Sequence, residues 1–347
     1  MPNDSHVVIR NEAVQPLVFK SVKDLYDTPA EQTSYCVEGM LPTSGMSILA
    51  GKPKAGKTTF ARQLAVAVAQ GESFLGRQTH QGTVLYLALE EKQSEVTAHF
   101  QQLGLTESDP VLVRCGPVPM KDGAVSALER ALKEMPDIML VIIDPIFRFI
   151  GVRDGNDYVQ VNNALEQVLD LARRYGVHIL TVHHLKKKET EDVSDATLGS
   201  TAIVAATDTF LALRVDGRGV RTLCSRQRYG HDMEPTILVW NEETRSFSLG
   251  ETADKAEQQT ANATRTRIER EMWAYVAAQP GCTQEAILNA VRGKVSTKKS
   301  VLQGFLDQKA FVRSGAGVKG EPHLYQIGPI LNEAGQAVVP TGDTCEV

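Results

Sequence analysis

Apolar residues in this chain form short continuous runs, each bounded by polar or turn-forming residues. Runs of this length without strict alternation are typical of strands that are buried on both faces of a sheet. Segments with helical periodicity lie between the runs. The runs cover residues 46–50, 82–89, 111–114, 138–143 and 177–182, and the helical segments cover residues 59–70, 92–103, 125–134 and 159–175. This order predicts an α/β fold in which helices cover a parallel central sheet.

The core that these elements predict extends over residues 38–249, because two further strands follow at residues 208–214 and 221–225. Residues 1–37 form an N-terminal arm that we expect to pack against this core. A partly disordered tail is an equally open alternative for residues 1–14. The arm shows no residues that suggest catalysis.

A second, smaller domain is predicted after the core. Residues 250–264 are polar and rich in small side chains, which is the composition of a linker. Residues 265–328 contain three helical segments and a two-stranded hairpin, an arrangement typical of a winged helix that binds DNA through its third helix. A protein-interaction module is the alternative. The lysines that we expect to face nucleic acid are Lys294, Lys298 and Lys299. Residues 329–347 have the composition of a disordered tail.

Composition and charge limit the classes of protein that remain. The net charge of -5 excludes a uniformly basic surface that coats nucleic acid, yet residues 265–327 hold ten basic and five acidic residues, an excess that favours DNA contact. The five cysteines show no C-x-x-C spacing, which argues against a zinc ribbon and fits a reducing cytoplasm. No apolar run approaches the length that crosses a bilayer, so we expect neither secretion nor membrane attachment.

The clearest chemical signal is a phosphate-binding loop directly after the first buried run. Its residues match the pattern G-x-x-x-x-G-K-[ST] between a predicted strand and a predicted helix. Glycines let the backbone wrap closely around a phosphate chain, Lys57 would reach the β and γ phosphates, and Thr58 would bind Mg²⁺. The predicted nucleotide-binding residues of this loop are Gly51, Lys52, Pro53, Lys54, Ala55, Gly56, Lys57, Thr58 and Thr59. The sequence therefore predicts binding of ATP with Mg²⁺.

Carboxylates follow two of the buried runs at the point where each strand ends. Asp144 closes the run at residues 138–143 and is expected to hold Mg²⁺, because a buried carboxylate needs a cation or hydrogen-bond donors. Glu90 and Glu91 close the run at residues 82–89, where open α/β sheets place their chemistry. One of them, Glu90 in our assignment, would deprotonate the water that attacks the γ-phosphate. The alternative is an acidic first turn of the next helix.

Two further groups are candidates for contact with the nucleotide. His183 and His184 end a strand, and adjacent strand residues point to opposite faces, so a metal site made by both is disfavoured. His183 is expected either to sense the γ-phosphate or to lie behind it as a hydrogen-bonded histidine. Arg226 and Arg228 project to one side of an extended segment. They either stabilise the charge of a triphosphate, in trans if the protein forms a ring, or form an exposed basic edge.

Together these residues resemble the RecA-like ATPases and, among them, the hexameric replicative helicases of the plasmid RepA and bacterial DnaB types. The similarity extends over residues 38–247. Its most specific part combines a glutamate on the neighbouring strand with the pattern Arg226-x-Arg228-x-Gly230. The resemblance implies that Glu90 is the catalytic base and that Arg226 and Arg228 act on the nucleotide of the adjacent subunit. The segments that would face a channel for single-stranded DNA are residues 147–158 and 186–198.

The chain departs from the helicase pattern in three respects. The first position of the arginine finger, often lysine in DnaB-type enzymes, is Arg226. Glu91 adds a second carboxylate, as in tandem-glutamate relatives such as the KaiC clock ATPases. Because only about forty residues precede the core, we expect no helical collar of the DnaB type.

Three functions remain open on the sequence. The first is an ATP-driven motor, a hexameric ring that translocates on single-stranded DNA and unwinds duplex in the replication of a plasmid, phage or other mobile element. The second is a DNA-binding ATPase that does not unwind, acting in recombination, partition or regulation. The third is a scaffold or signalling ATPase that recruits partners through its C-terminal domain. DNA-stimulated hydrolysis separates the third function from the first two, and strand displacement separates the first from the second.

Overall fold

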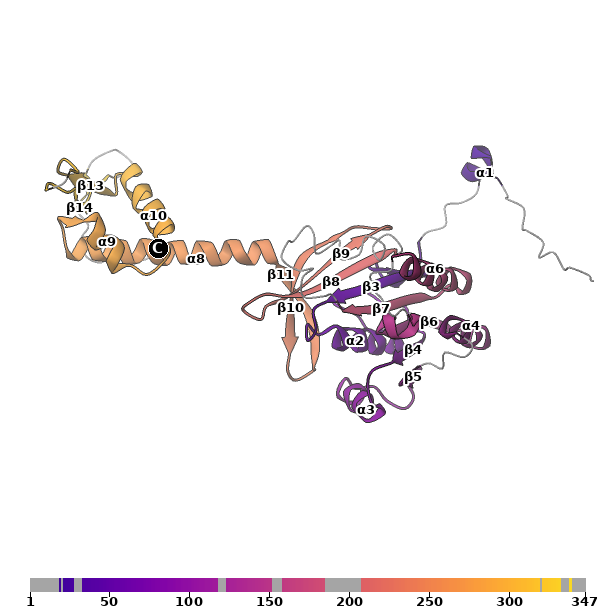
Figure 1. The fold of residues 1–347 in the computed structure, drawn as a ribbon. Helices are drawn as coiled ribbons and strands as arrows, with labels where there is room; N and C mark the ends of the chain where they lie inside the picture. Colours follow the sequence, from indigo (N-terminus) through magenta and orange to yellow (C-terminus); the bar gives the residue numbers. More distant parts are fainter. Residues whose placement is uncertain are drawn as a thin grey trace, which may run out of the picture.

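The computed structural model describes residues 19, 21–27, 33–117, 123–151, 158–184, 207–318, 320–331 and 337–338. Within these ranges a nine-stranded sheet forms the centre of the molecule, in the order β11-β10-β9-β8-β3-β7-β6-β4-β5 (Figure 1). Its parallel strands are β3 (Gly45–Gly51), β4 (Thr83–Ala88), β5 (Val111–Cys115), β6 (Ile138–Asp144), β7 (His178–His184) and β8 (Thr209–Val215). The antiparallel strands that extend it are β9 (Arg221–Gln227), β10 (Met233–Asn241) and β11 (Ser246–Thr252).

Helices cover both faces of this sheet, and successive residues of each buried strand belong to different cores. The helices are α2 (Lys57–Gln70), α3 (Gln93–Gln102), α4 (Ala124–Glu134), α5 (Ile146–Ile150) and α6 (Tyr158–Tyr175). Leu49 of β3 lies in one core with Phe60 of α2, while Ile48 lies in the other with Leu165 of α6. Because both faces are covered, the strands need no polar alternation. The predicted α/β class with a mainly parallel central sheet is confirmed.

The order of the strands in space differs from their order along the chain. β3, which leads into the phosphate-binding loop, lies between β7 and β8. β4, which precedes Glu90, pairs with β5 and β6 and is not a direct neighbour of β3, contrary to the expectation from the sequence. β6 and β7 occupy the positions between them. The parallel strands nevertheless end at one edge, which we call the carboxyl rim, so residues after each strand can share a site there.

Only the last part of the N-terminal arm is built into the core among the described residues. After the short helix α1 (Val22–Asp27), β1 (Tyr35–Val37) pairs with β2 (Leu41–Pro42). Cys36 of β1 is fully buried and belongs to the same core as α2. Residues 1–18 lie outside the part of the chain that the structure describes.

The long helix α8 (Ala253–Ala278) leads to a C-terminal unit at its far end (Figure 1), and this unit has a hydrophobic core of its own. There Ile268 and Met272 of α8 pack with Val301 and Phe311. The other elements of this C-terminal unit are α9 (Gln284–Ala290), α10 (Val295–Asp307) and a sheet in the order β12 (Cys282–Thr283), β14 (Leu324–Ile327) and β13 (Phe311–Ser314). Its assignment as a winged helix stays a prediction.

The structure differs from the sequence prediction at two boundaries of the C-terminal part. Residues 253–264, predicted as a linker, form the first turns of α8 and are mostly exposed. Their alanine, glutamate, glutamine and lysine residues have high helix propensity, so a polar segment can be helical without being buried. In the predicted tail, β15 (Ile330–Leu331) pairs with β16 (Ala337–Val338), and residues 332–336 and 339–347 are not described. None of the described helices combines the length and apolar composition that spanning a bilayer requires.

Candidate functional site

The phosphate-binding loop joins the end of β3 to the start of α2, and its geometry requires glycine at two positions. A side chain at Gly51 would collide with the carbonyl oxygen of Leu213 on β8. Gly56 has a φ of 103°, in the left-handed region, and a Cβ there would lie 2.9 Å from Cζ of Phe247. Of the other predicted loop residues, Lys52, Pro53 and Lys54 are exposed, Ala55 is buried, and Thr58 and Thr59 are half-buried in the first turn of α2.

Lys57 is the first residue of α2 and is almost fully buried, with 3% of its surface exposed. Its Nζ donates hydrogen bonds to the carbonyl oxygens of Gly51 and Lys52, each at 2.8 Å. Burial lowers the pKa of Lys57 to about 8, and the nearby charge of Asp144 opposes this shift. The loop backbone therefore holds a partly desolvated ammonium at the start of a helix, and both features favour binding of an anion.

Asp144 ends β6 on the carboxyl rim. It is 6% exposed, and its Oδ2 has no hydrogen-bond partner among the described residues. Burial raises the pKa of Asp144 to about 6, while a hydrogen bond from the Thr58 hydroxyl lowers it. A buried carboxylate oxygen without a donor, beside a hydroxyl, fits a hard cation such as Mg²⁺, which prefers oxygen ligands. The structure brings Thr58 and Asp144 together, and their role as metal ligands stays a prediction.

Glu90 and Glu91 follow β4 but have different partners. Glu91 forms an ion pair with Arg62, an almost fully buried residue of α2. Glu90 pairs with Arg148 of α5, with 2.9 Å between Oε1 and Nε, and its side chain is 45% exposed. The buried guanidinium of Arg62 thus compensates the charge of Glu91, whereas the side chain of Glu90 remains partly exposed to solvent at the rim. This difference favours Glu90 over Glu91 as the residue that contacts a reacting water.

The two histidines at the end of β7 lie on opposite faces of the sheet. In the pairing of β7 with β3, His184 is opposite Gly51 and His183 is opposite Ala50. Because strand residues alternate between faces, His184 is on the α2 face with the phosphate-binding loop. His183 is on the other face, where its ring centroid is 4.9 Å from that of Phe147.

His184 is electrostatically coupled to the candidate site. Partial burial lowers the pKa of His184, the charge of Lys57 lowers it further, and the charge of Glu90 opposes both effects. The structure therefore places His184 beside these groups, rather than the predicted His183. The sequence could not distinguish them, because the run before them is apolar on both faces and shows no alternation.

Arg226 and Arg228 lie at the opposite end of the sheet from the loop. β9 runs antiparallel to β8, and Arg226 is paired with Phe210 near the amino end of β8. Arg226 forms an ion pair of 2.9 Å with Asp232, and a guanidinium nitrogen of Arg228 lies 3.6 Å from Oδ1 of Asp208. The structure brings neither arginine to the phosphate-binding loop of its own chain.

Residues that support the loop from other elements were not found from the sequence. Nε of Arg221 on β9 donates to the carbonyl oxygen of Ala55 at 3.2 Å. The side chain of Gln63 on α2 makes two hydrogen bonds of 2.8 Å with the backbone N and O of Phe247 on β11. No local signal predicts these contacts, since they depend on how distant strands pair. Arg62, in contrast, could have been singled out from the sequence, because it is the single charged residue between Thr58 and Gln70 in a largely apolar helical segment.

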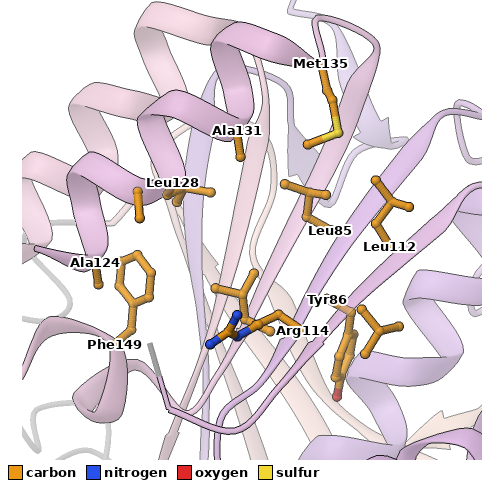
Figure 2. A pocket seen from close by; sticks show the side chains of 12 residues that line it. Leu85, Tyr86, Leu112, Arg114, Ala124, Leu128, Ala131, Met135 and Phe149 are labelled. Atoms are coloured by element: carbon orange, nitrogen blue, oxygen red, sulfur yellow. The ribbon is translucent and has the colours of Figure 1, made fainter. Parts of the chain in front are cut away.

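An apolar hollow of about 360 Å³ lies between α4 and the strands β4 and β5 (Figure 2). It contains none of the predicted site residues. Phe149 of α5 lines one side of it, and Arg114 of β5 is its single charged lining residue among those described. The hollow is connected to the site through α5, the helix that also carries Arg148, and through β4, the strand that precedes Glu90.

Comparisons with known proteins identify the family. A comparison with curated protein sequences gives no match. Among solved structures, a KaiC-like protein from the hyperthermophilic archaeon Pyrococcus horikoshii OT3 aligns with a TM-score of 0.46 and 15% identity, over 62% of this chain and 93% of its own. The family model described as an AAA domain matches residues 13–190, just over half of the chain, and this range contains the loop, Glu90 and Asp144. The chain therefore belongs to the AAA domain family of P-loop ATPases.

Proposed function

We propose that this protein is a RecA-like, ATP-driven motor that forms a ring, translocates on single-stranded DNA and unwinds duplex in the replication of a mobile element. The observation that carries the proposal is the convergence of Lys57, Thr58 and Asp144 at one rim, with Glu90 at its open side. Lys57 would supply a positive charge for the phosphates, Thr58 and Asp144 oxygen ligands for a metal ion, and Glu90 a carboxylate that activates water. Hydrolysis of a nucleoside triphosphate needs each of these groups.

The chemistry follows from what each side chain can do. Lys57 and the loop N–H groups would bind the β and γ phosphates of ATP. Thr58 and Asp144 would hold Mg²⁺, which when bound neutralises part of the phosphate charge. Glu90 would accept the proton of the attacking water through a carboxylate oxygen. His184 would take the role of the polar group near the γ-phosphate, because it is the histidine on the loop face.

Arg226 and Arg228 would act only from a neighbouring subunit. They lie at the amino end of β8, away from the loop of their own chain, and Arg226 is exposed. In a head-to-tail ring, that end of one subunit can face the carboxyl rim of the next, so a guanidinium can stabilise transition-state charge across the interface. We therefore propose a homo-oligomer, and a hexamer by the resemblance to replicative helicases.

The C-terminal unit is the proposed contact with duplex DNA. Its exposed basic residues include Arg292, Lys294, Lys299, Lys309 and Arg313. Lys298, which we expected to face nucleic acid, is buried instead, and its Nζ donates to the carbonyl oxygens of Leu288 and Val291 at the end of α9. A positive charge is favourable at a helix C-terminus, so this lysine has a structural role. Residues 152–157 and 186–198, predicted to face the channel, lie outside the described residues.

The test is steady-state ATP hydrolysis with and without single-stranded DNA, with duplex as a control and at fixed salt, because phosphate contacts are strongly salt-dependent. Stimulation by single strands supports the motor. ATP-dependent strand displacement then separates a helicase from an ATPase that only binds DNA. Turnover that no DNA changes would overturn the DNA part of the proposal and favour a scaffold ATPase.

A further inference from the structure

The carboxyl rim continues on the side of the phosphate-binding loop that faces away from the groups assigned to metal and water. Asp144, Glu90 and His184 belong to β6, β4 and β7 or follow them, and these strands lie on one side of β3 in the sheet. β8, β9, β10 and β11 lie on the other side (Figure 1). Because the groups that would act on the γ-phosphate lie on the first side, the base end of a bound nucleotide would extend toward the second.

Trp240 lies at the carboxyl rim on this second side. β9 runs antiparallel to β8, and β10 runs antiparallel to β9, so β10 has the direction of β3 and ends at the same rim. Trp240 is the last residue but one of β10 and is half-buried. It is paired with Phe247 of β11, and both side chains pack against the core that contains α2. An indole ring is therefore placed at the rim, beside the strand that contacts the loop.

A row of packed side chains connects the phosphate-binding loop with the turn between β10 and β11. Phe247 packs against Gly56, where an added Cβ would lie 2.9 Å from Cζ of the phenylalanine. The ring centroids of Phe247 and Trp240 are 5.0 Å apart. The guanidinium carbon of Arg245, an exposed residue, lies 5.8 Å from the centroid of the Trp240 ring. The row therefore leads from the loop to solvent and contains a flat ring and a cation at its outer end.

Both ends of this row are held by hydrogen bonds of the backbone. At the inner end, the side chain of Gln63 on α2 bonds both backbone groups of Phe247. At the outer end, the side chain of Asn241 accepts two backbone hydrogen bonds of the turn, at 2.8 and 3.0 Å. Arg245 has a φ of 51°, in the left-handed region that few residues other than glycine adopt. The fold of the turn therefore places this arginine over the indole.

We propose that the purine base of the nucleotide stacks on the indole of Trp240, and that Arg245 closes over the base from the solvent side. The inference rests on the proposed function and adds recognition of the base at the same site. Aromatic rings gain from offset stacking, and the two fused rings of a purine offer more overlap than a pyrimidine. A planar guanidinium also stacks on an aromatic face. Trp240 would thus select the base and take no part in the chemistry.

Tryptophan fluorescence tests the stacking directly, because the chain contains two tryptophans. The second one, Trp273, packs with Phe305 and Phe311 in the C-terminal unit. Titration with ATP and Mg²⁺ should quench the tryptophan emission of wild type and of the matched control Trp273→Phe. Trp240→Phe should show no quenching at saturating ATP. Quenching that persists in Trp240→Phe and disappears in Trp273→Phe would overturn the proposal.

Binding measurements separate the base from the phosphates, with inorganic tripolyphosphate as the probe that lacks a base. Trp240→Ala should raise the Kd for ATP about five- to hundredfold, which is what loss of one stacked base commonly costs, and should leave the Kd for tripolyphosphate unchanged. Its preference for ATP over CTP should largely disappear, while kcat at saturating ATP stays near wild type. Arg245→Ala should raise the Kd for ATP about two- to fivefold, because an exposed cation–π contact is weaker.

The outcomes distinguish the base site from the proposed function. Wild-type affinity for ATP and a kept preference over CTP in Trp240→Ala would overturn the base site. Equal losses of affinity for ATP and tripolyphosphate in this variant would also overturn it, because the ring would then only support the loop. If DNA leaves turnover unchanged but the effects of Trp240→Ala on ATP binding are present, the DNA part of the proposed function fails and the base site stands.

Discussion

The two ends of the central sheet each bury an aspartate, and the two aspartates differ in the ion pairs around them. At the amino end, Asp208 is 2% exposed, and its Oδ2 accepts a hydrogen bond of 3.1 Å from the backbone N of Met46. Its Oδ1 lies 3.7 Å from Arg173 and 3.6 Å from Arg228. At the carboxyl rim, Asp144 is nearly as buried, and its Oδ2, like Oδ1 of Asp208, has no hydrogen-bond donor among the described residues. The nearby guanidinium of Arg62, however, pairs with Glu91 and not with Asp144.

This difference is the one that we expect between a structural carboxylate and a carboxylate that binds a cation. Surrounding a buried charge with guanidinium groups offsets the cost of taking it out of water. Leaving a carboxylate oxygen uncompensated costs stability and raises the affinity for a cation. Proteins accept such local costs at functional sites, so the carboxyl rim is where we expect substitutions to change activity more than stability.

Removing the positive charge of Lys57 from the carboxyl rim should have the largest effect on turnover. Lys57→Ala deletes the only loop side chain among the described residues that supplies a buried positive charge toward the phosphates. We expect turnover to fall by on the order of 10²- to 10³-fold, because preorganised charge stabilises the transition state. Steady-state ATP hydrolysis measures this loss, with the exposed Lys133→Ala as the control variant. Normal turnover of Lys57→Ala would rule out the assignment of the nucleotide site.

Exchanging each aspartate for asparagine tests the comparison directly. Asp144→Asn should lose Mg²⁺-dependent nucleotide binding and on the order of 10²-fold in turnover, with an unchanged or raised melting temperature, because it removes a buried carboxylate whose Oδ2 has no hydrogen-bond donor among the described residues. Asp208→Asn should instead lose about 1–3 kcal/mol of stability, because two guanidinium groups lose their carboxylate, and should keep its nucleotide affinity. Thermal unfolding and nucleotide titration separate the two outcomes. Equal losses of stability in both variants would break the comparison.

The sequence predicted the carboxyl rim better than the amino end, for a physical reason. The residues of the rim follow directly after apolar runs, so Lys57, Asp144 and Glu90 could be placed from local pattern alone. The partners of Asp208 come from α6 and from the end of β9, and only the three-dimensional pairing brings them together. The sequence likewise could not show that His184, and not His183, lies on the face of the loop, or that Lys298 contacts the end of α9.

The pH dependence of Mg²⁺–nucleotide binding is a smaller expected effect, and it tests the two buried charged groups of the carboxyl rim, Asp144 and Lys57. The raised pKa of Asp144, about 6, means that its carboxyl is protonated at lower pH, so affinity should fall as pH drops below 6. The lowered pKa of Lys57, about 8, means that its ammonium is lost at higher pH, so affinity should also fall as pH rises above 8. Each limb should approach about tenfold per pH unit. Titration of a fluorescent nucleotide between pH 5 and 9 measures both limbs in the wild type, and the residual affinity of Asp144→Asn should show no acid limb.

Mixing two inactive variants tests whether the amino end also takes part in chemistry, through a neighbour. Arg228→Ala should bind ATP and lose turnover, and Glu90→Ala should do the same. In a ring assembled from equal amounts, about a quarter of the interfaces would join an intact Glu90 to an intact Arg228, so hydrolysis should return to about a quarter of the wild-type rate at most. Arg173→Ala is the control, because it removes the other guanidinium from Asp208 and leaves Arg228 in place. If Arg173→Ala loses as much turnover as Arg228→Ala, and no mixing ratio restores hydrolysis, then Arg228 serves Asp208 alone and the amino end is purely structural.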